Sequence, residues 1–390
     1  MRHVSRGTIT TTMFHVKHFF NVMIEWKLVK ELAETYKINF TDYFNPFPYI
    51  EEPDADGNEP GQLMVIGNRG PGKTTAFCII NILVNRIFQK KFIYIFRTSE
   101  ELTSVSALFE DSLALYPKLG KEITTQPLLK NLIYEIFLDG NSVGFSICIG
   151  TRMQIDKLKK YSPIFKDCYL IIFEEFLTES GYYLPKEIEK LQSILVSISR
   201  GGGKMSAERK LIYLANKVAV MNPYFVYFGI YKNYNKDAKI IHLHGLNVCF
   251  NHDVRSDKAI SQNPLLKAFE NSDYFNYASR GDFLLDTSAF IQKPKGKSHY
   301  IFTVLYDSEY YGFWEYFEEG FFYFSTKYIS NYQTILTFKP SDHNQNTMML
   351  NNYTWITKIL KNAYYEGILR FNDEKAKMVC MEILAIDIYK

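Results

Sequence analysis

Residues 64–75, MVIGNRGPGKTT, contain the residue types that proteins use to bind phosphate. Gly67, Gly72, Lys73 and Thr74 follow the pattern G-x-x-x-x-G-K-[ST], a glycine-rich turn between a strand and a helix. In such a turn, backbone N–H groups surround the phosphate, the lysine contacts the β and γ oxygens, and the threonine hydroxyl binds Mg²⁺. We therefore expect ATP and Mg²⁺ as ligands, bound by Gly67, Asn68, Arg69, Gly70, Pro71, Gly72, Lys73, Thr74 and Thr75.

A second motif, LIIFEEF, is an apolar strand that ends in two carboxylates. This is the Walker-B arrangement, in which Glu174 would help to hold Mg²⁺ and Glu175 would orient the attacking water. Aspartate is more usual at the first position, and Glu174 places a longer side chain there. The alternative is a solvated strand end, which the nearby phosphate-binding pattern disfavours.

Three further polar residues are candidates for the catalytic machinery. Asn216 ends the strand LIYLAN and could sense the γ-phosphate, although an ordinary strand-terminating asparagine is the alternative. Arg69, within the phosphate loop, and Arg200, just before GGGK, compete to stabilise the transition state. Arg200 is suited to reach the ATP of a neighbouring subunit, as arginine fingers do. Its alternative is a surface charge favoured by the helix dipole.

A basic stretch, DKLKKYSPIFKD, precedes the Walker-B strand. Its lysines Lys157, Lys159 and Lys160 predict a loop that contacts the phosphate backbone of nucleic acid without reading sequence. A solvated basic loop is the alternative. The run HLHGLNVCFNH has metal-binding residue types but no standard ligand spacing, so we do not expect a metal site there.

Bulk composition sets limits on the class of protein. The chain has 390 residues, 47% hydrophobic and 22% charged, which is typical of a globular protein with a large core. A net charge of +3 neither requires nor excludes a polyanionic partner. The five cysteines form no C-x-x-C pair and indicate a reducing cytoplasm. No apolar run is long enough to cross a membrane, so we expect a soluble protein without membrane contact.

Strands and helices alternate through residues 61–243, which we predict to be an α/β domain with a mostly parallel sheet covered on both faces. The expected strands are 62–67, 91–97, 168–176 and 209–216, with a hairpin across Asp139-Gly140-Asn141. The expected helices are 24–37, 73–89, a segment around ELTSVSALFEDSLALY, and 186–199.

The remaining segments have different character. Residues 1–60 form an N-terminal extension whose first ~20 residues read as disordered, with a later start at Met23 or a short basic tail as equal alternatives. Residues 244–288 are polar and predict a linker. Residues 289–390 begin with three aromatic strands in an antiparallel meander and end in a largely helical stretch.

The motifs VIGNRGPGKTT, KFIYIFR, LIIFEEF and LANKVAVMNPYFVYFGI, with NQNTMMLNNY and YYEGILRFND nearer the end, occur in a specific order. In this order they resemble the DNA-packaging ATPases, or encapsidation proteins, of small short-tailed protein-primed phages of Firmicutes. The likeness covers roughly residues 43–388.

This resemblance implies a terminase-like ATPase of the additional-strand type, followed by a small α+β RNase H-like domain. It also implies a homomeric, pentameric ring in the host cytoplasm, transiently attached to the portal of a procapsid. By the same resemblance, a packaging RNA would lie between ring and portal, and the ring would drive double-stranded viral DNA with its covalent terminal protein into the shell. By motif position, Lys73 and Thr74 match the phosphate loop, Glu175 the catalytic carboxylate and Arg200 the trans finger, although the GGGKMSAE spacer is longer here.

An RNase H-like nuclease needs several carboxylates that converge on metal ions. The first strand of the C-terminal region, HYIFTVLY, has none, and Asp307, Glu309, Glu318 and Glu319 fall in turns or at strand ends. We therefore expect a nuclease-inactive docking domain. Two other functions stay open from the residues: another P-loop DNA motor, such as a helicase loader or a phage-assembly ATPase, and a nucleotide-regulated scaffold without turnover.

Overall fold

The computed structural model describes residues 24–42, 44–68, 70, 72–150, 152–179, 183–184, 186–200, 209–218, 222–234, 238–272, 275, 291, 294–349 and 354–388. The disorder expected for the first ~20 residues and the alternative start at Met23 lie outside these ranges.

The larger sheet has nine strands in the order β3-β4-β5-β2-β6-β7-β1-β9-β8. The six strands from β5 to β9 in this order are parallel to one another, and antiparallel strands lie at both edges. The strands are β1 (Gln62–Gly67), β2 (Lys91–Phe96), β3 (Ile123–Leu129), β4 (Ile133–Leu138), β5 (Asn141–Cys148), β6 (Cys168–Phe173), β7 (Lys210–Asn216), β8 (Ile240–Leu243) and β9 (Leu246–Asn251). The mostly parallel α/β fold is confirmed.

Strand β7 lies between β1 and β6 and pairs with both. The strand before the phosphate loop and the strand before the two glutamates are therefore separated by one additional strand, as expected for an additional-strand ATPase. Because all three strands are parallel, their carboxyl ends meet at one edge of the sheet.

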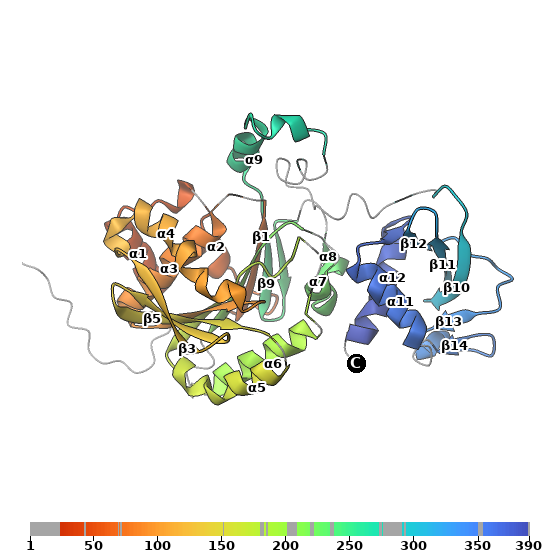
Figure 1. Ribbon diagram of the computed structural model, residues 1–390, viewed down its shortest axis with the longest axis horizontal. Helices are drawn as coiled ribbons and strands as arrows, with labels where there is room; N and C mark the ends of the chain where they lie inside the picture. The colour runs from red at the N-terminus through yellow and green to blue at the C-terminus, as the bar shows by residue number, and fades with distance from the viewer. Residues whose placement is uncertain are drawn as a thin grey trace, which may run out of the picture.

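Both faces of this sheet are covered by helices, as the buried apolar strands predict (Figure 1). Along β1, Leu63 and Val65 belong to one hydrophobic cluster, whereas Met64 and Ile66 belong to the other. The first cluster includes residues of α1 (Trp26–Thr35), α2 (Phe47–Ile50), α3 (Lys73–Phe88) and α4 (Val105–Leu115). The second includes residues of α5 (Arg152–Lys160), α6 (Glu187–Arg200), α7 (Pro223–Tyr227) and α8 (Ile230–Asn233).

The part of the N-terminal extension that is described packs onto the sheet domain. The predicted amphipathic helix is present as α1, whose Trp26, Val29 and Ala33 are buried. The Trp26 indole donates a hydrogen bond to Glu59, which also pairs with the buried Lys210 of β7. The described residues of this extension thus complete the core instead of standing apart from it.

Two local expectations are wrong. The segment assigned to a linker begins with β9, which pairs with β1 in the main sheet, so the sheet extends past residue 243 to Asn251. The histidines and asparagines in and around this strand make it look polar in the sequence, although its first four residues are buried. The stretch of lysines expected in a loop is largely helical, because Lys157, Lys159 and Lys160 lie in α5.

The C-terminal region contains a separate sheet of six strands, ordered β14-β13-β10-β11-β12-β15. The meander is confirmed as β10 (His299–Tyr306), β11 (Glu309–Tyr316) and β12 (Phe321–Ser325). The short parallel strands β13 (Ile335–Thr337), β14 (Met348–Met349) and β15 (Leu369–Phe371) extend it, and the last of these interrupts the stretch expected to be helical.

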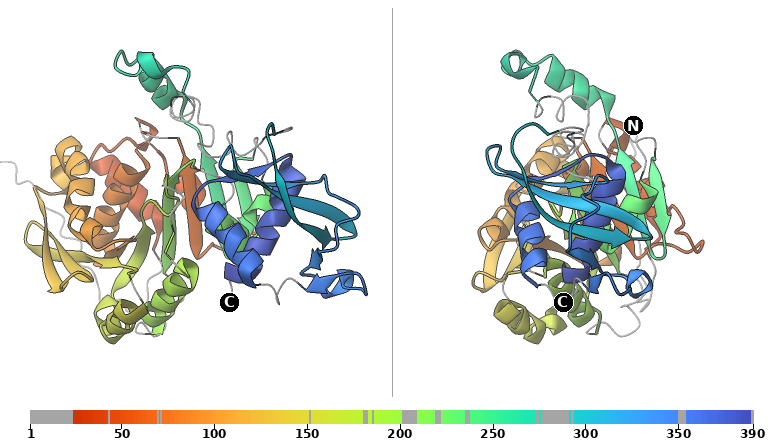
Figure 2. Two further views of the ribbon diagram at one scale, coloured as in Figure 1. Left: turned by 45° about the vertical axis from the view of Figure 1, so that its right-hand side comes forward. Right: turned by 90° about the vertical axis from the view of Figure 1, so that its right-hand side faces the viewer.

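Helices α11 (Thr354–Tyr365) and α12 (Glu374–Ile388) share a hydrophobic cluster with this smaller sheet. Helix α12 also contacts α7 of the larger sheet domain (Figure 2). Between the two sheets the chain forms α9 (Val254–Ser261) and a short 3₁₀ turn, Lys267–Phe269.

Candidate nucleotide-binding site

The phosphate loop connects the end of β1 to the start of α3. Gly70 and Gly72 have φ angles of 89° and 79°, a conformation that residues with a Cβ rarely adopt. At Gly67 the requirement is steric, because an added Cβ would lie 2.8 Å from the carbonyl oxygen of Asn251 on β9. Arg69 and Pro71 lie outside the described residues.

Lys73 is buried at the start of α3, with 7% of its surface exposed. Its Nζ donates to the backbone oxygen of Asn68 at 2.8 Å and to Oδ1 of Asn216 at 3.3 Å. Asn216 reaches this position because it is the register partner of Gly67 in the parallel β1–β7 pair. The structure therefore brings together Lys73 and the asparagine that the sequence singled out.

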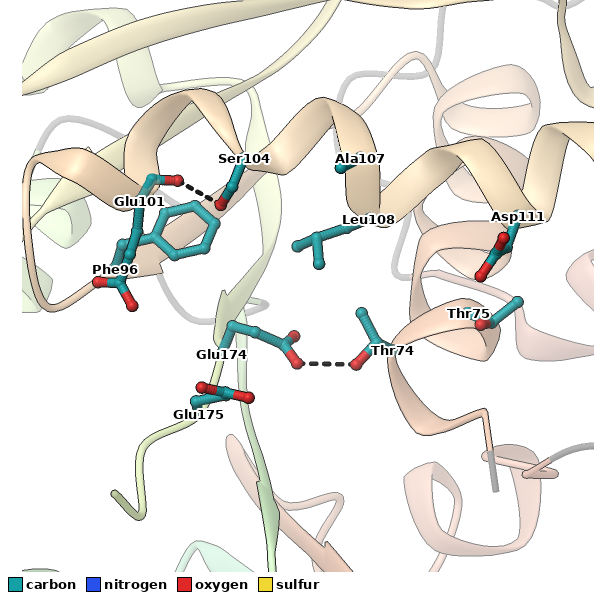
Figure 3. A pocket seen from close by; sticks show the side chains of 10 residues that line it. All are labelled: Thr74, Thr75, Phe96, Glu101, Ser104, Ala107, Leu108, Asp111, Glu174 and Glu175. Carbon is teal, nitrogen blue, oxygen red and sulfur yellow. Dashed lines mark hydrogen bonds between the residues drawn. The ribbon is translucent and has the colours of Figure 1, made fainter. Parts of the chain in front are cut away.

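Thr74 and Glu174 face each other across the site (Figure 3). The Thr74 hydroxyl donates to Oε1 of Glu174 at 2.7 Å. The other carboxylate oxygen, Oε2, is buried and has no hydrogen-bond partner among the described residues. Burial raises the pKa of Glu174 to about 7; the Thr74 hydrogen bond opposes this shift and the Glu175 charge adds to it.

These donors fit a magnesium ion. Mg²⁺ prefers oxygen ligands and usually takes only one or two from protein, with water and phosphate oxygens completing its shell. Thr74 offers a hydroxyl, and Glu174 offers a buried oxygen that has no hydrogen-bond partner in the described part of the chain. Within the described part of the chain, no group of three or more His, Cys, Asp or Glu side chains could hold a metal, so nucleotide and water would supply the remaining ligands.

Glu175 is exposed and lines the same cleft as Lys73, Thr74, Glu174 and Asn216. Its φ of 48° is unusual for a residue with a side chain and indicates local backbone strain, which tends to occur at functional sites.

Sequence reasoning did not single out the residues that hold this turn. The Arg97 guanidinium donates to the backbone oxygens of Glu175 and Phe176 at 3.2 and 3.0 Å, and it forms a buried ion pair with Glu187. Tyr224 donates a further hydrogen bond to the same carboxylate at 2.7 Å. The only local signal was an arginine that ends a buried strand, and Glu187 looked like an ordinary first-turn residue of a helix.

Helix α4 supplies the opposite wall of the cleft. Asp111 lines it together with Thr74, Thr75, Glu174 and Glu175, and Figure 3 shows Asp111 beside Thr75. Asp111 was not a sequence candidate, because a charge on an amphipathic helix looks the same whether it faces solvent or a site.

Arg200 does not join these residues. Helix α6 begins near the phosphate-binding edge, where Glu187 pairs with Arg97. Near its end, the carbonyl of Ile198 accepts a hydrogen bond from Arg209, which just precedes β7. Helix α6 thus runs antiparallel to the strands, and Arg200 lies exposed at the amino edge of the sheet. It is remote from the phosphate loop of its own chain.

The predicted DNA-binding lysines lie towards that same amino edge, because α5 also runs away from the carboxyl ends of the strands. Lys157 and Lys160 are exposed, and Lys159 forms a surface pair with Asp156. Arg209 also donates to the carbonyls of Phe165 and Lys166, so it ties the segment after α5 to the end of α6.

The histidines expected not to bind metal have other contacts. His244 pairs with Asp56 at 2.7 Å, which raises its pKa, and His242 contacts the backbone oxygen of Pro53.

In the smaller sheet, two acidic residues near the turn between β10 and β11 form ion pairs with lysines. Asp307 pairs with Lys339 at 2.6 Å and Glu309 with Lys375 at 2.5 Å. As noted above, they do not gather with other described acidic residues into a group able to hold a metal.

Among the described residues, no helix has both the length and the apolar character needed to cross a bilayer.

Comparison with known proteins places this site in context. The DNA packaging protein of Bacillus phage phi29 is 26% identical over 325 residues, which cover 82% of this chain and 92% of that protein. The DNA packaging protein of Bacillus phage B103 is 23% identical, with 82% and 95% covered. The chain from the bacteriophage phi29 genome packaging motor assembly superposes with a TM-score of 0.48 at 21% identity, covering 90% of this chain and all of that one. Because this TM-score is low, we draw no conclusion from the superposition.

The sequence model of the podovirus DNA encapsidation proteins (Gp16) matches residues 61–387, from the start of β1 to the last helix. This range includes the phosphate loop, both glutamates and the C-terminal sheet. The chain therefore belongs to the podovirus DNA encapsidation protein (Gp16) family.

Proposed function

We propose that this protein is an ATP-driven motor that moves double-stranded viral DNA into a procapsid. The observation that carries the proposal is the pairing of Thr74 with Glu174 beside the pairing of Lys73 with Asn216, at one sheet edge of an encapsidation-family chain. Family membership favours genome packaging over a helicase loader, and the strained Glu175 favours turnover over a passive nucleotide-binding scaffold.

In this proposal, each residue of the site has a separate role in ATP hydrolysis. Backbone N–H groups at the start of α3 and the Lys73 amine bind the phosphates. Mg²⁺, held by Thr74 and Glu174, would neutralise charge on the β- and γ-phosphates. Glu175 orients a water and accepts its proton as the water oxygen attacks the γ-phosphorus and the bond to the ADP oxygen breaks.

Asn216 connects the γ-phosphate to the rest of the sheet. It contacts Lys73 directly and ends β7, whose neighbour β6 leads into the two glutamates. A change in the position of Lys73 on hydrolysis would therefore reach Asn216 first. Arg69 remains a proposed phosphate ligand within the loop.

Arg200 acts on a neighbouring copy in this proposal. Its place at the amino edge of the sheet prevents it from reaching its own phosphate loop, whereas a ring of identical subunits could bring it to the next site. We propose such a ring, pentameric as the resemblance implies.

The remaining partners follow from the resemblance. Lys157, Lys159 and Lys160 of α5 would contact DNA phosphates, with packaging RNA, terminal protein and the portal as further partners in the host cytoplasm. The C-terminal region would be an RNase H-like docking domain without nuclease activity. The lysine partners of Asp307 and Glu309 support this, since each offsets a charge that a metal would need.

ATP hydrolysis by the purified protein, with and without double-stranded DNA, tests the proposal. We expect DNA to stimulate turnover, and Glu175→Gln to lower kcat by about 10²- to 10⁴-fold while ATP still binds, because only the water-orienting carboxylate is lost. Glu179→Gln, an exposed change in the same loop, is the control.

A rate of ATP hydrolysis that is the same with and without DNA would indicate another kind of P-loop ATPase. ATP binding without turnover, even at high protein concentration with DNA and procapsids, would support the scaffold instead.

A further inference from the structure

The side chain of Asn68, in the phosphate loop, is held by a distant segment of the chain. Asn68 is completely buried. Its Nδ2 donates to the backbone oxygen of Asp253 at 2.9 Å and to Oδ1 of Asp257 at 2.7 Å. Its Oδ1 accepts from the backbone N–H of Asp253 at 3.0 Å. Both amide hydrogens and the amide oxygen are therefore used in contacts with the start of α9.

The backbone of the same residue contacts the phosphate-binding lysine. The carbonyl oxygen of Asn68 accepts the hydrogen bond from Lys73 Nζ at 2.8 Å. Strand register explains why α9 reaches this point: Gly67 pairs with Asn251 at the ends of the parallel strands β1 and β9, and α9 begins at Val254. The loop that leaves β9 must therefore pass beside the loop that leaves β1.

Asp257 is fixed from its other side as well. Its Oδ2 lies 2.8 Å from Nε2 of His252, and only 14% of its side chain is exposed. Asp253 caps the helix by accepting a hydrogen bond from the N–H of Arg255 at 2.9 Å. A bond accepted by a carboxylate is stronger than one between neutral groups, so the bond to Asp257 is the strongest that the Asn68 side chain makes.

We propose that Asp257 is a positioning residue for the phosphate loop, and that its bond to Asn68 makes nucleotide binding and the order of α9 depend on each other. The proposal rests on the nucleotide-binding function inferred above. Coupling between two sites is reciprocal, so if Asp257 helps to form the loop that binds ATP, bound ATP must stabilise α9.

The position of α9 would allow a partner bound to this helix to affect nucleotide binding. Figures 1 and 2 show α9 projecting from the body of the molecule, at the start of the chain segment that leads to the smaller sheet. A phosphate loop that responds to nucleotide would change the stability of α9. A partner that holds α9 would in turn change the affinity of the loop for ATP.

Binding of a fluorescent ATP analogue in the presence of Mg²⁺ tests the contact. Asp257→Ala removes the acceptor for Asn68, and we expect about tenfold weaker binding, the effect of losing one hydrogen bond to a charged group. KM for ATP should rise by a similar factor with little change in kcat. Asp257→Asn keeps an oxygen that can accept the bond and should bind within about twofold of wild type. Glu270→Ala, an exposed charge beyond α9, is the matched control.

Hydrogen exchange of the α9 amides provides a readout that a merely structural role would not change. In the wild type, the ATP analogue should slow exchange across residues 254–261, and in Asp257→Ala this protection should disappear. The wild-type measurement needs no variant, so it tests the proposal even if Asp257→Ala does not fold.

Unchanged exchange in α9 on nucleotide binding, or equal ATP affinity of Asp257→Ala and wild type, would overturn the proposal. If the wild type binds no ATP at all, the nucleotide-binding function itself is wrong, and the positioning role falls with it.

Discussion

The carboxylates of the two sheets differ in their burial and in their partners. At the edge of the larger sheet, Glu174 accepts a hydrogen bond from the Thr74 hydroxyl, and its other carboxylate oxygen is buried with no hydrogen-bond partner among the described residues. In the smaller sheet, Asp307 lies in an exposed turn and Glu309 is the exposed first residue of β11, and each is paired with a lysine. A buried carboxylate without a cation is unfavourable and is ready to accept one, whereas an exposed carboxylate with an ammonium partner gains little from a metal. The larger sheet therefore offers a carboxylate oxygen to the proposed Mg²⁺, whereas these two carboxylates of the smaller sheet already have cationic partners.

The two regions also differ in how their lysines are held. Lys73 is buried beside the phosphate loop, and its Nζ donates to the backbone oxygen of Asn68 and to Oδ1 of Asn216. Lys339 is partly exposed, and its charge is already opposed by Asp307. The same residue type therefore lies buried at the proposed phosphate site of one sheet and is paired with an acid in the other.

Matched lysine substitutions test this difference with the largest expected effect. Lys73→Met should lower kcat/KM for ATP by at least about 10²- to 10³-fold, because it removes a positioned donor that stabilises phosphate charge. Lys339→Met should leave ATP turnover unchanged. Steady-state ATPase assays with DNA measure both, and a comparable loss in the two variants would contradict the assignment of the nucleotide site.

The pH dependence of stability tests the burial of Glu174. Burial raises its pKa from 4.5 to about 7, so the folded protein holds this proton more tightly than the unfolded chain does. The wild type should therefore be most stable, with respect to this group, below pH 4.5 and should lose stability as the pH rises through about 7.

Glu174→Gln removes this titration. Without nucleotide and Mg²⁺ at pH 8, the variant should have a free energy of unfolding higher than that of wild type by about 2–3 kcal/mol, and the difference should shrink towards pH 5. Denaturant unfolding at both pH values measures this. Glu110→Gln, an exposed change on α4, should show no such trend. A constant difference across pH would mean that the Glu174 carboxylate is not desolvated.

The smallest effect is expected at the lysine-paired acid. Asp307→Asn should change the free energy of unfolding by less than about 1 kcal/mol, because exposed ion pairs contribute little. The full chain should leave plasmid DNA intact in Mn²⁺, and so should Lys339→Met, in which Asp307 is released. DNA cleavage by either protein that disappears in Asp307→Asn would show that the smaller sheet is still a nuclease.

The main elements of the nucleotide site could be predicted because their signals are local. The strand, glycine turn and lysine-threonine helix start occupy consecutive residues, and an apolar run followed by two glutamates is equally compact. The limits of β1, α3 and β7 agree with the expected ranges to within a residue. Strand β9 was missed because only its first four residues are buried and its partner β1 lies far away in sequence.

The predicted lysine loop is a helix because of buried contacts that the sequence does not reveal. Lys157, Lys159 and Lys160 read as a loop because charge dominates the stretch, yet Ile155 and Leu158 are buried and hold it as a helix against the sheet. Two apolar positions three residues apart are too few to reveal a helix from sequence, but they are enough to anchor one once α6 and the sheet provide a surface.

The sequence by itself determined which residues can bind phosphate and carry acid chemistry, since Lys73, Thr74, Glu174 and Glu175 belong to short motifs. Only the tertiary structure decided that Asn216 contacts Lys73, that Arg97 holds the turn at Glu175, and that Asn68 is bound by Asp257. Each of these contacts joins residues from 78 to 189 positions apart. The physical reason is parallel pairing, which brings the carboxyl ends of distant strands to one edge and leaves no local trace of which strands will be neighbours.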